Sequence, residues 1–251
     1  MSKCYRAALL LCALGVTTPT LADEVKVAVA ANFLDVITTL AGQFEQQTGH
    51  TVLVSSGSTG KLYAQIKNGA PFDVFFAADD QRPELLEQQE AIVPGSRFTY
   101  ALGTLVLWSP DKQLIDDELT VLKNGDFRFL AIANPATAPY GRAAQEVLTG
   151  MGLWQGVDRK MVRGENIGQT YQYVYSRNAE LGFVAKSQVF SQGEYAPGSW
   201  WEVPAEQYAP IVQQAVQLKE APAAKALLEY VRSPEGLAVI RAYGYGIEQA
   251  Q

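Results

Sequence analysis

The chain has 251 residues, of which 48% are hydrophobic, and it carries 20 Lys and Arg against 26 Asp and Glu. The resulting net charge of −6 argues against nucleic acid or an anionic membrane surface as a partner. It does not exclude a small anionic ligand, because local dipoles rather than total charge decide the binding of such a ligand. The length is sufficient for two compact lobes.

Residues 1–22 have the pattern of a secretory signal peptide. Lys3 and Arg6 form a basic start, and an apolar run at 7–16 follows that is too short to span a bilayer. The small residue Ala22 marks the expected cleavage site. We therefore expect an exported protein that begins at residue 23.

Both cysteines, Cys4 and Cys12, lie within this segment. A lipid anchor at Cys12 is the alternative, and it is disfavoured because Leu11 stands where a small residue is needed. The exported chain then has no disulfide, thiolate nucleophile or cysteine metal ligand. It keeps 18 cations against 26 carboxylates, a net charge of −8, since the segment contains two cations and no carboxylate.

Strand and helix patterns alternate along the rest of the chain. Apolar or alternating runs predict strands at 25–29, 51–54, 73–78, 129–133, 181–185 and 210–218, and a further apolar run covers 100–109. Helical spacing follows Asn32, the 55–61 turn and Asn166, and another helix opens at Pro139. Two helices close the chain, and the last begins at Ser233-Pro234. We expect Asn32 and Asn166 to cap the helices that follow them.

This alternation predicts an α/β fold with mostly parallel sheets flanked by helices. The pattern alone leaves two arrangements open. One is a single large doubly wound domain. The other has two lobes joined by strands that cross near residues 100–105 and 208–212, with lobe one formed by 23–100 and 209–251 and lobe two by 101–208.

Four stretches share one form, in which an apolar run leads through a tight turn of small residues into a helix. They are residues 25–32, 52–61, 130–141 and 163–170. Helix N-termini present unpaired N–H groups and the positive end of the helix dipole. If the four turns converge, they form an anion site that needs no charged side chain. Because none carries a residue suited to nucleophilic or metal chemistry, a receptor for a small anion is favoured over an enzyme.

The turn at 55–61, SSGSTGK, is similar to a phosphate-binding loop but lacks its first glycine and its final Ser or Thr. Ser58 and Thr59 can still donate O–H groups, and we expect the backbone N–H groups of Gly60 and Lys61 to point the same way. An ordinary strand-to-helix turn is the alternative for this loop.

Asn32 and Tyr140 are two further candidate donors. Asn32 follows the first strand, and its amide can donate to an oxyanion or cap its own helix. Tyr140 stands at a helix start, where its hydroxyl can donate to an anion or its ring can simply pack.

An enzyme or metal site finds little support in the sequence. His50 is the only histidine, and it stands in a loop without the Gly-x-Ser-x-Gly turn of a hydrolase. No histidine or carboxylate spacing predicts zinc. Tyr171, Tyr173 and Tyr175 could suggest tyrosinate ligands of iron, but at helical spacing they face different directions, so we interpret them as packing residues.

The combined motifs resemble the periplasmic molybdate-binding proteins of ABC transporters over residues 25–246. The runs that carry the resemblance are VAANF at 29–33, GSTGKLYAQI at 57–66, GAPFDVF at 69–75, ANP at 133–135, YGRAA at 140–144, GENIGQ at 164–169, LGFV at 181–184 and SPEG at 233–236. No single run is specific, but the set is. The resemblance implies the two-lobe fold of these proteins, with two crossing strands.

The resemblance also implies the anion-binding residues. Asn32 matches a Ser or Asn position, Thr59 a binding serine with Ser58 beside it, and Ile167 a residue that donates its backbone N–H. Tyr140 matches a tyrosine donor of one branch. Another branch has its tyrosine where this chain has Ala185, so we expect Tyr140 to supply the tyrosine hydroxyl.

The implied function is capture of molybdate, and of tungstate, for a membrane permease. The resemblance implies a periplasmic monomer without cofactor that closes its lobes around the anion. Alternatives are a binding protein for sulfate, phosphate or ferric iron, and more remotely a periplasmic hydrolase. Sequence does not separate molybdate from tungstate, because the two anions have nearly the same size and charge.

Overall fold

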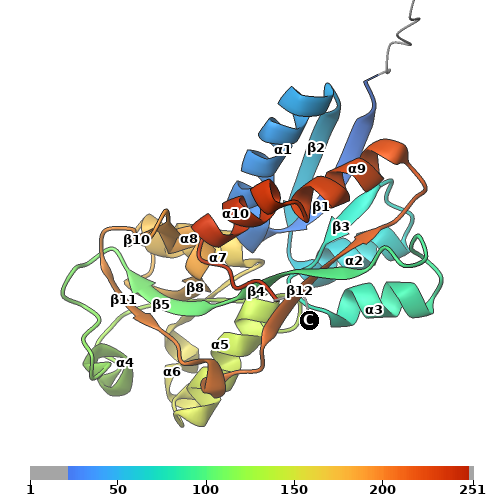
Figure 1. The fold of residues 1–251 in the computed structure, drawn as a ribbon. Helices are drawn as coiled ribbons and strands as arrows, with labels where there is room; N and C mark the ends of the chain where they lie inside the picture. Colours follow the sequence, from blue (N-terminus) through green and yellow to red (C-terminus); the bar gives the residue numbers. More distant parts are fainter. Residues whose placement is uncertain (1–21, 249–251) are drawn as a thin grey trace, which may run out of the picture.

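The computed structural model describes residues 22–248, so Cys4, Cys12 and nearly all of the predicted signal peptide lie outside the described residues. Figure 1 shows two lobes, each built on a sheet with helices against it. Both sheets have five strands, and the fold is the α/β two-lobe arrangement that the resemblance implies rather than one doubly wound domain. None of the helices between residues 22 and 248 has the length and apolar character that a membrane crossing requires.

The first sheet has the strand order β2-β1-β3-β12-β4. Its strands are β1 (Glu24–Ala30), β2 (Thr51–Gly57), β3 (Val74–Phe76), β4 (Phe98–Gly103) and β12 (Ile211–Gln217). β1 pairs in parallel with β2 and β3, whereas β12 runs antiparallel to its neighbours β3 and β4.

The second sheet repeats this plan with the order β7-β6-β8-β5-β11. Its strands are β5 (Leu105–Ser109), β6 (Leu130–Ala133), β7 (Met161–Gly164), β8 (Leu181–Ala185) and β11 (Ser199–Glu202). β6 pairs in parallel with β7 and β8, and β5 runs antiparallel to β8 and β11. A small hairpin joins β9 (Phe190–Ser191) to β10 (Glu194–Tyr195).

The chain passes from the first sheet to the second between Gly103 and Leu105, and it returns between Glu202 and Ile211. The predicted boundary after residue 100 falls inside β4, whereas the one after residue 208 falls in the connection before β12. Both connections lie where the lobes meet.

Helices cover both faces of each sheet. The first sheet carries α1 (Leu34–Thr48), α2 (Thr59–Lys67), α3 (Gln81–Gln88), α9 (Pro222–Val231) and α10 (Pro234–Ala242). The second carries α4 (Thr120–Asn124), α5 (Pro139–Gly150), α6 (Trp154–Val157), α7 (Ile167–Tyr175) and α8 (Lys186–Val189). Three 3₁₀ turns are η1 (Ala31–Phe33), η2 (Asp158–Lys160) and η3 (Ala205–Gln207).

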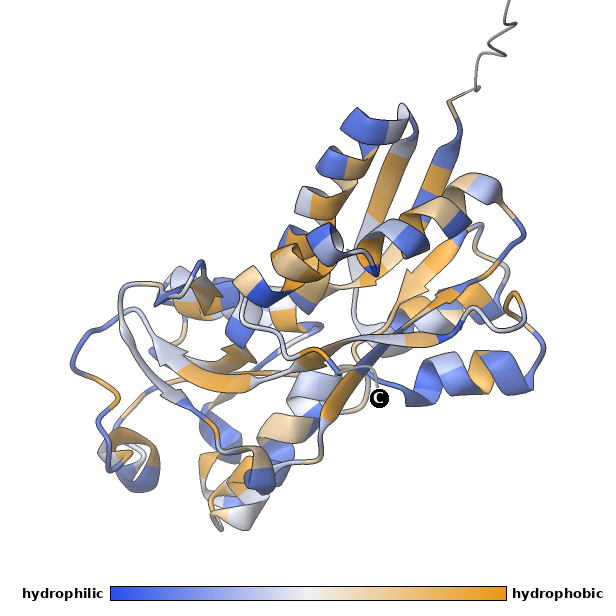
Figure 2. Ribbon diagram, in the orientation of Figure 1, coloured by the Kyte–Doolittle hydropathy of each residue, from blue (hydrophilic) through white to orange (hydrophobic). Residues whose placement is uncertain are grey.

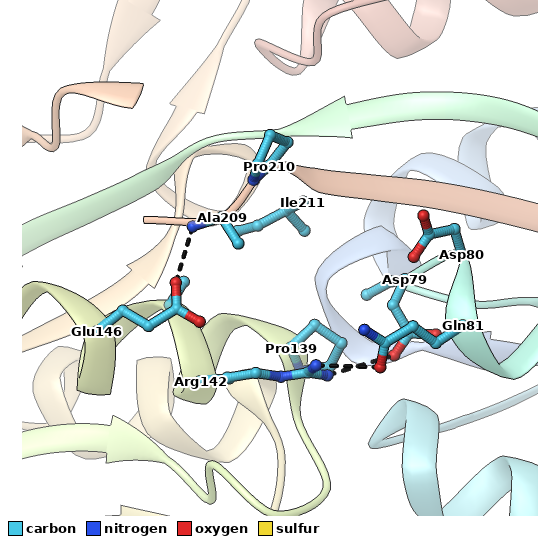
Figure 3. A pocket seen from close by; sticks show the side chains of 11 residues that line it. Asp79, Asp80, Gln81, Pro139, Arg142, Glu146, Ala209, Pro210 and Ile211 are labelled. Carbon is cyan, nitrogen blue, oxygen red and sulfur yellow. Dashed lines mark hydrogen bonds and ion pairs between the residues drawn. The ribbon is translucent and has the colours of Figure 1, made fainter. Parts of the chain in front are cut away.

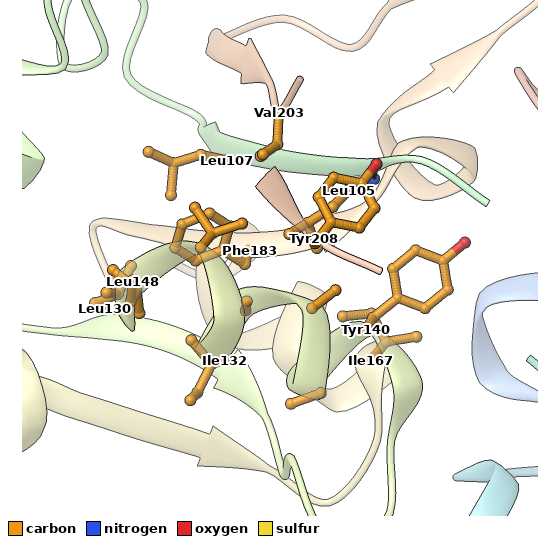
Figure 4. Packing of buried hydrophobic residues seen from close by; sticks show 14 of the residues in the cluster. Leu105, Leu107, Leu130, Ile132, Tyr140, Leu148, Ile167, Phe183, Val203 and Tyr208 are labelled. Carbon is orange, nitrogen blue, oxygen red and sulfur yellow. Dashed lines mark hydrogen bonds between the residues drawn. The ribbon is translucent and has the colours of Figure 1, made fainter. Parts of the chain in front are cut away.

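Each lobe has its own apolar core on both faces of its sheet. In β1, Val27 and Val29 pack toward α1 and α9, whereas Ala28 faces α2 and α3, as the alternation of a strand requires. In the second lobe, Leu105 and Phe183 pack against α5 (Figure 4). β3 is accordingly apolar throughout, whereas β12 carries a hydrophilic stretch in its middle (Figure 2). Two rigid cores hold the loops between them in place.

The predicted helix cap at Asn32 is wrong. A 3₁₀ turn at Ala31–Phe33 precedes α1, whose first residue is Leu34 and which has no side-chain cap. The extra turn directs the Asn32 side chain inward, where its Nδ2 donates to Gln213 and Tyr245. The predicted cap at Asn166 is confirmed, because its Oδ1 accepts the N–H of Gln169 at 2.9 Å.

Candidate anion-binding site

The carboxyl ends of parallel strands from both lobes point at one small cavity. β1, β2 and β3 end there from the first lobe, and β6 and β7 end there from the second. The lining of the cavity consists of Ala30, Ala31, Asn32, Gly57, Ser58, Thr59, Ala78, Ala138, Pro139, Tyr140, Asn166 and Ile167. Ligands of open α/β sheets bind beyond these strand ends, so the topology itself favours a binding site here.

The structure brings together all five residues that the sequence singled out. Asn32, Ser58, Thr59, Tyr140 and Ile167 line the cavity, and each side chain is buried. They come from four separate strand-to-helix turns. The arrangement therefore has the convergence that the repeated turn pattern predicted.

Two hydroxyl groups of the first lobe have protons to donate. The Ser58 hydroxyl is buried, and no protein atom within residues 22–248 partners it. The Thr59 oxygen accepts the backbone N–H of Ala78 at 3.0 Å, so its own proton remains available. Both hydroxyls lie at the N-terminus of α2, where the helix dipole favours negative charge.

The expectation for the backbone N–H of Gly60 is wrong. This group donates to the carbonyl oxygen of Thr137, 2.9 Å away in the second lobe. This N–H is therefore already hydrogen-bonded to the other lobe, because the loop before α5 lies against the start of α2. A carbonyl acceptor in the opposite lobe cannot be foreseen from the local turn pattern.

The second lobe contributes two helix N-termini. Pro139 occupies the first turn of α5, and within the described chain the N–H of Tyr140 that follows finds no acceptor. Asn166 caps α7 through the N–H of Gln169, and the N–H of Ile167 likewise has no acceptor among the described residues. Unpaired N–H groups beside a buried cavity call for a ligand or water as acceptor.

The hydroxyl of Tyr140 lies away from these N–H groups, at the strands that connect the lobes. Its oxygen is 3.1 Å from Nε2 of Gln213, which donates to it. A Cβ atom on Gly103 would lie 2.3 Å from this oxygen, so only glycine fits there. The hydroxyl thus has a protein partner, and its donation to an anion stays a prediction.

Three buried phenols contact the amide of Gln213 or that of Asn32, and they keep their protons. Burial raises the pKa of Tyr100 and Tyr140 well above the usual value, and the neighbouring phenol of Tyr245 raises it further. Burial also raises the pKa of Tyr245. All three hydroxyls therefore remain neutral donors at any physiological pH.

No residue lining this cavity is charged, among those that the structure describes. Cations instead form ion pairs at its rim, where Lys61 contacts Glu165 of the other lobe at 2.8 Å. In a neighbouring pocket, Arg142 of α5 reaches across to Gln81 at 3.1 Å and to Asp79 at 3.8 Å (Figure 3). These contacts join the lobes on either side of the cavity without placing a positive charge inside it.

Metal and triad chemistry receive no support from the described residues. Across residues 22–248 there is no group of three or more His, Cys, Asp or Glu side chains that could hold a metal ion. His50 lies outside the cavity lining, where its Nδ1 accepts the N–H of Asp23 at 3.1 Å.

Sequence reasoning missed the buried polar residues behind the cavity. Gln213 on β12 and Tyr245 near the C-terminus both contact Asn32. Gln213 stands in the apolar run Ile211-Val212-Gln213-Gln214-Ala215. A polar residue at an inward strand position was the available signal for a buried, bonded side chain.

Comparisons with known proteins identify the family of the chain. Residues 25–246 match the family model described as bacterial extracellular solute-binding protein. The chain is 53% identical over 230 residues to the molybdate-binding protein ModA of Azotobacter vinelandii, covering 90% of this chain and 91% of that protein. It is 46% identical to ModA of Rhodobacter capsulatus, covering 94% of this chain and 93% of that protein.

A solved structure, the periplasmic molybdate-binding protein of Azotobacter vinelandii, superimposes with a TM-score of 0.87 at 46% identity. The alignment covers 90% of this chain and all of that one. The chain therefore belongs to the bacterial extracellular solute-binding proteins. Within that family, the relatives named here are molybdate-binding proteins.

Proposed function

We propose that this chain is a periplasmic receptor that captures molybdate, and with it tungstate, and delivers the anion to an ABC permease. The observation that carries the proposal is the cavity between the lobes, which combines donors from four helix starts with the absence of any charged lining residue. The relatives that cover nearly the whole chain are named for molybdate, which supports this choice of anion.

A tetrahedral oxyanion needs several hydrogen-bond donors and no acceptors. The donors proposed for it are the hydroxyls of Ser58 and Thr59, the backbone N–H groups of Tyr140 and Ile167, and Asn32. Helix dipoles from both lobes supply partial positive charge without a Lys or Arg. The anion can therefore leave without the breaking of a tight ion pair.

Closure of the lobes would couple binding to transport. Each lobe holds only part of the donor set, so an anion contacts the complete set only in the closed form. Its differential affinity shifts the population from open to closed. We propose that a permease recognises this closed form, that the receptor acts as a monomer without cofactor, and that it catalyses no reaction. The two lobes would be the units that move, with residues 104 and 203–210 as the connections between the sheets.

A calorimetric titration with molybdate, tungstate, sulfate and phosphate tests the proposal. Donors fixed on two rigid lobes select by anion size, so molybdate and tungstate should bind at least about 100-fold more tightly than sulfate, or about 2.7 kcal/mol. Equal affinity for sulfate would contradict the molybdate assignment and leave a general oxyanion receptor. Ferric iron is disfavoured because no carboxylate lines the cavity among the described residues.

A further inference from the structure

Gln213 is a buried polar residue on β12, the strand that returns the chain to the first lobe. Its side chain is completely inaccessible and contacts binding residues from both lobes. Oε1 lies 2.7 Å from Nδ2 of Asn32 in the first lobe, and Nε2 lies 3.1 Å from the hydroxyl of Tyr140 in the second. Gln213 does not line the cavity, but it connects residues of the proposed site that belong to different lobes.

The amide of Asn32 has one unsatisfied end. Its Nδ2 donates to Gln213 and, at 2.9 Å, to the hydroxyl of Tyr245, which uses both of its protons. Its Oδ1 is buried and has no donor within residues 22–248. Asn32 lines the cavity, and an unpaired carbonyl oxygen at this residue would repel an anion, so this orientation of the amide opposes the proposed function.

If the side-chain amides of Asn32 and Gln213 both turn so that oxygen and nitrogen exchange places, Asn32 no longer has an unpaired oxygen at the proposed anion site. An amide has nearly the same shape when its oxygen and nitrogen exchange places. With both amides turned, Nε2 of Gln213 donates to Oδ1 of Asn32 and to the hydroxyl of Tyr100, at the observed separations of 2.7 and 3.0 Å. Tyr100 in turn donates to the carbonyl oxygen of Ala77, 3.1 Å away.

The remaining partners also suit the turned arrangement. Tyr140 donates to Oε1 of Gln213, and Tyr245 donates to Oδ1 of Asn32, while Ser187 donates to the backbone oxygen of Asn32 at 2.8 Å. The amide oxygens of Asn32 and Gln213 then each have a donor, and the proton of Tyr245 moves from the backbone oxygen of Asn32 to Oδ1, while Ser187 still donates to that backbone oxygen. The NH₂ group of Asn32 takes the place of the orphaned oxygen, where a bound anion can accept from it.

We propose that Gln213 is a positioning residue that sets the orientation of the Asn32 amide and so presents its NH₂ group to the anion. The inference rests on the proposed function. Since Gln213 also holds the Tyr140 hydroxyl, the same side chain ties the amide orientation in the first lobe to the start of α5 in the second. Asn32 contacts the ligand, and Gln213 acts through it.

The first test is a double-mutant cycle measured by calorimetry with molybdate. Gln213→Met keeps the size of the side chain and removes both hydrogen-bonding ends, and it should weaken affinity about ten-fold. In the Asn32→Ala background the same change should alter affinity by less than about two-fold, because the residue through which it acts is gone. The matched control is Gln214→Met on the same strand. Gln214 contacts Arg97 and Thr99 rather than the site, so this variant should bind like the parent.

The second test needs no variant at position 213. In the full-length exported protein labelled with ¹⁵N-asparagine, the side-chain NH₂ signals of Asn32, assigned with Asn32→Ala, should shift on saturation with molybdate. Unshifted signals in a protein that binds molybdate would overturn the inference. The inference would also be overturned if the effects of Gln213→Met and Asn32→Ala on affinity simply multiplied in the double variant, or if Gln213→Met bound molybdate as tightly as the parent. If the parent does not bind molybdate at all, the proposed function fails instead.

Discussion

The backbone N–H of Gly60 in the first lobe donates to the carbonyl oxygen of Thr137 in the second, across 2.9 Å. This bond lies beside the cavity and exists only while the lobes are together. A Cβ atom on Gly60 would approach both Cα and O of Thr137 to 3.1 Å, closer than ordinary van der Waals contact. Because these two backbones are so close, a larger residue at position 60 should disfavour the form in which the lobes are in contact.

The first prediction is that Gly60→Ala weakens molybdate binding several-fold without lowering the stability of the free protein. The added methyl group strains the closed form alone, and alanine suits the first turn of a helix at least as well as glycine. Calorimetry and thermal unfolding measure the two effects. Gly42→Ala is the control, because it lies in α1 with nothing within 4 Å of the added carbon. Parent-like affinity of Gly60→Ala would show that this contact is absent from the bound form.

The second prediction concerns stabilisation by the ligand. An anion at about 1,000 times its Kd that binds only the folded protein adds about 4 kcal/mol to the free energy of unfolding. For a chain of this size, each kcal/mol raises the melting temperature by roughly 2–4 °C. Saturating molybdate should therefore raise it by about 8–16 °C. Sodium chloride at the same concentration should not, and the absence of a shift with every oxyanion would indicate another class of ligand.

The third prediction separates two roles of Tyr140. A hydroxyl that donates directly to the anion, as the sequence suggested, would lose about ten- to a hundred-fold in affinity on Tyr140→Phe. In the turned arrangement proposed above, the proton of this hydroxyl goes to Oε1 of Gln213. We therefore expect a change within about five-fold, because the backbone N–H of residue 140 remains. In Tyr140→Phe the buried side-chain amide of Gln213 loses this partner, which should lower the free energy of unfolding by about 1–3 kcal/mol.

Denaturant titration and calorimetry distinguish these outcomes. Tyr208→Phe serves as the control, since it removes a hydroxyl that accepts the N–H of Leu105 outside the cavity lining. It should lower stability and leave affinity unchanged. A loss of affinity above ten-fold in Tyr140→Phe would support the direct role of its hydroxyl.

The fourth prediction concerns alkaline pH. Burial raises the pKa of Tyr100, Tyr140 and Tyr245 in the folded protein, whereas in the unfolded chain these phenols ionise near pH 10. Their contribution to stability is therefore complete below pH 10 and is lost as the pH rises above it. Each phenol that stays protonated in the folded form lowers the free energy of unfolding by about 1.4 kcal/mol per pH unit.

Urea titrations at pH 8, 9, 10 and 11 measure this dependence. The free energy of unfolding should be nearly flat to pH 9 and then fall steeply, and Tyr100→Phe should make the fall shallower. A fall of equal steepness in Tyr100→Phe would mean that this phenol ionises while the protein is still folded.

The sequence predicted the parts of the site that depend on local signals. Apolar strand, small turn and helix start occur within a dozen residues of each other, so the turns that hold Ser58, Thr59 and Ile167 could be found by pattern. Their convergence follows from the parallel sheets, whose strand ends share an edge. These are short-range features, and the structure brings them together as expected.

The contacts behind the cavity depend on residues that are distant in the chain. Asn32 and Tyr245 are 213 positions apart, and no local pattern pairs them. The helix cap predicted for Asn32 was wrong for the same reason, because its amide is recruited by Gln213 and Tyr245. Local capping competed with long-range burial of a polar group, and the long-range partners prevailed.

The position of β12 between β3 and β4 also determines the order in which the molecule can be completed. Apart from a single bridge between Leu102 and Gly246, β4 pairs only with β12, and both of these partners are synthesised after the whole second lobe. Until residues 211–217 are made, β3 lacks its second neighbour and β4 has no strand to pair with, and unpaired strand edges invite association with other chains. The second sheet needs no strand from beyond Glu202. The lobe that begins the chain is thus the last to be finished, and a truncated product would hold a complete second lobe beside an incomplete, aggregation-prone first one.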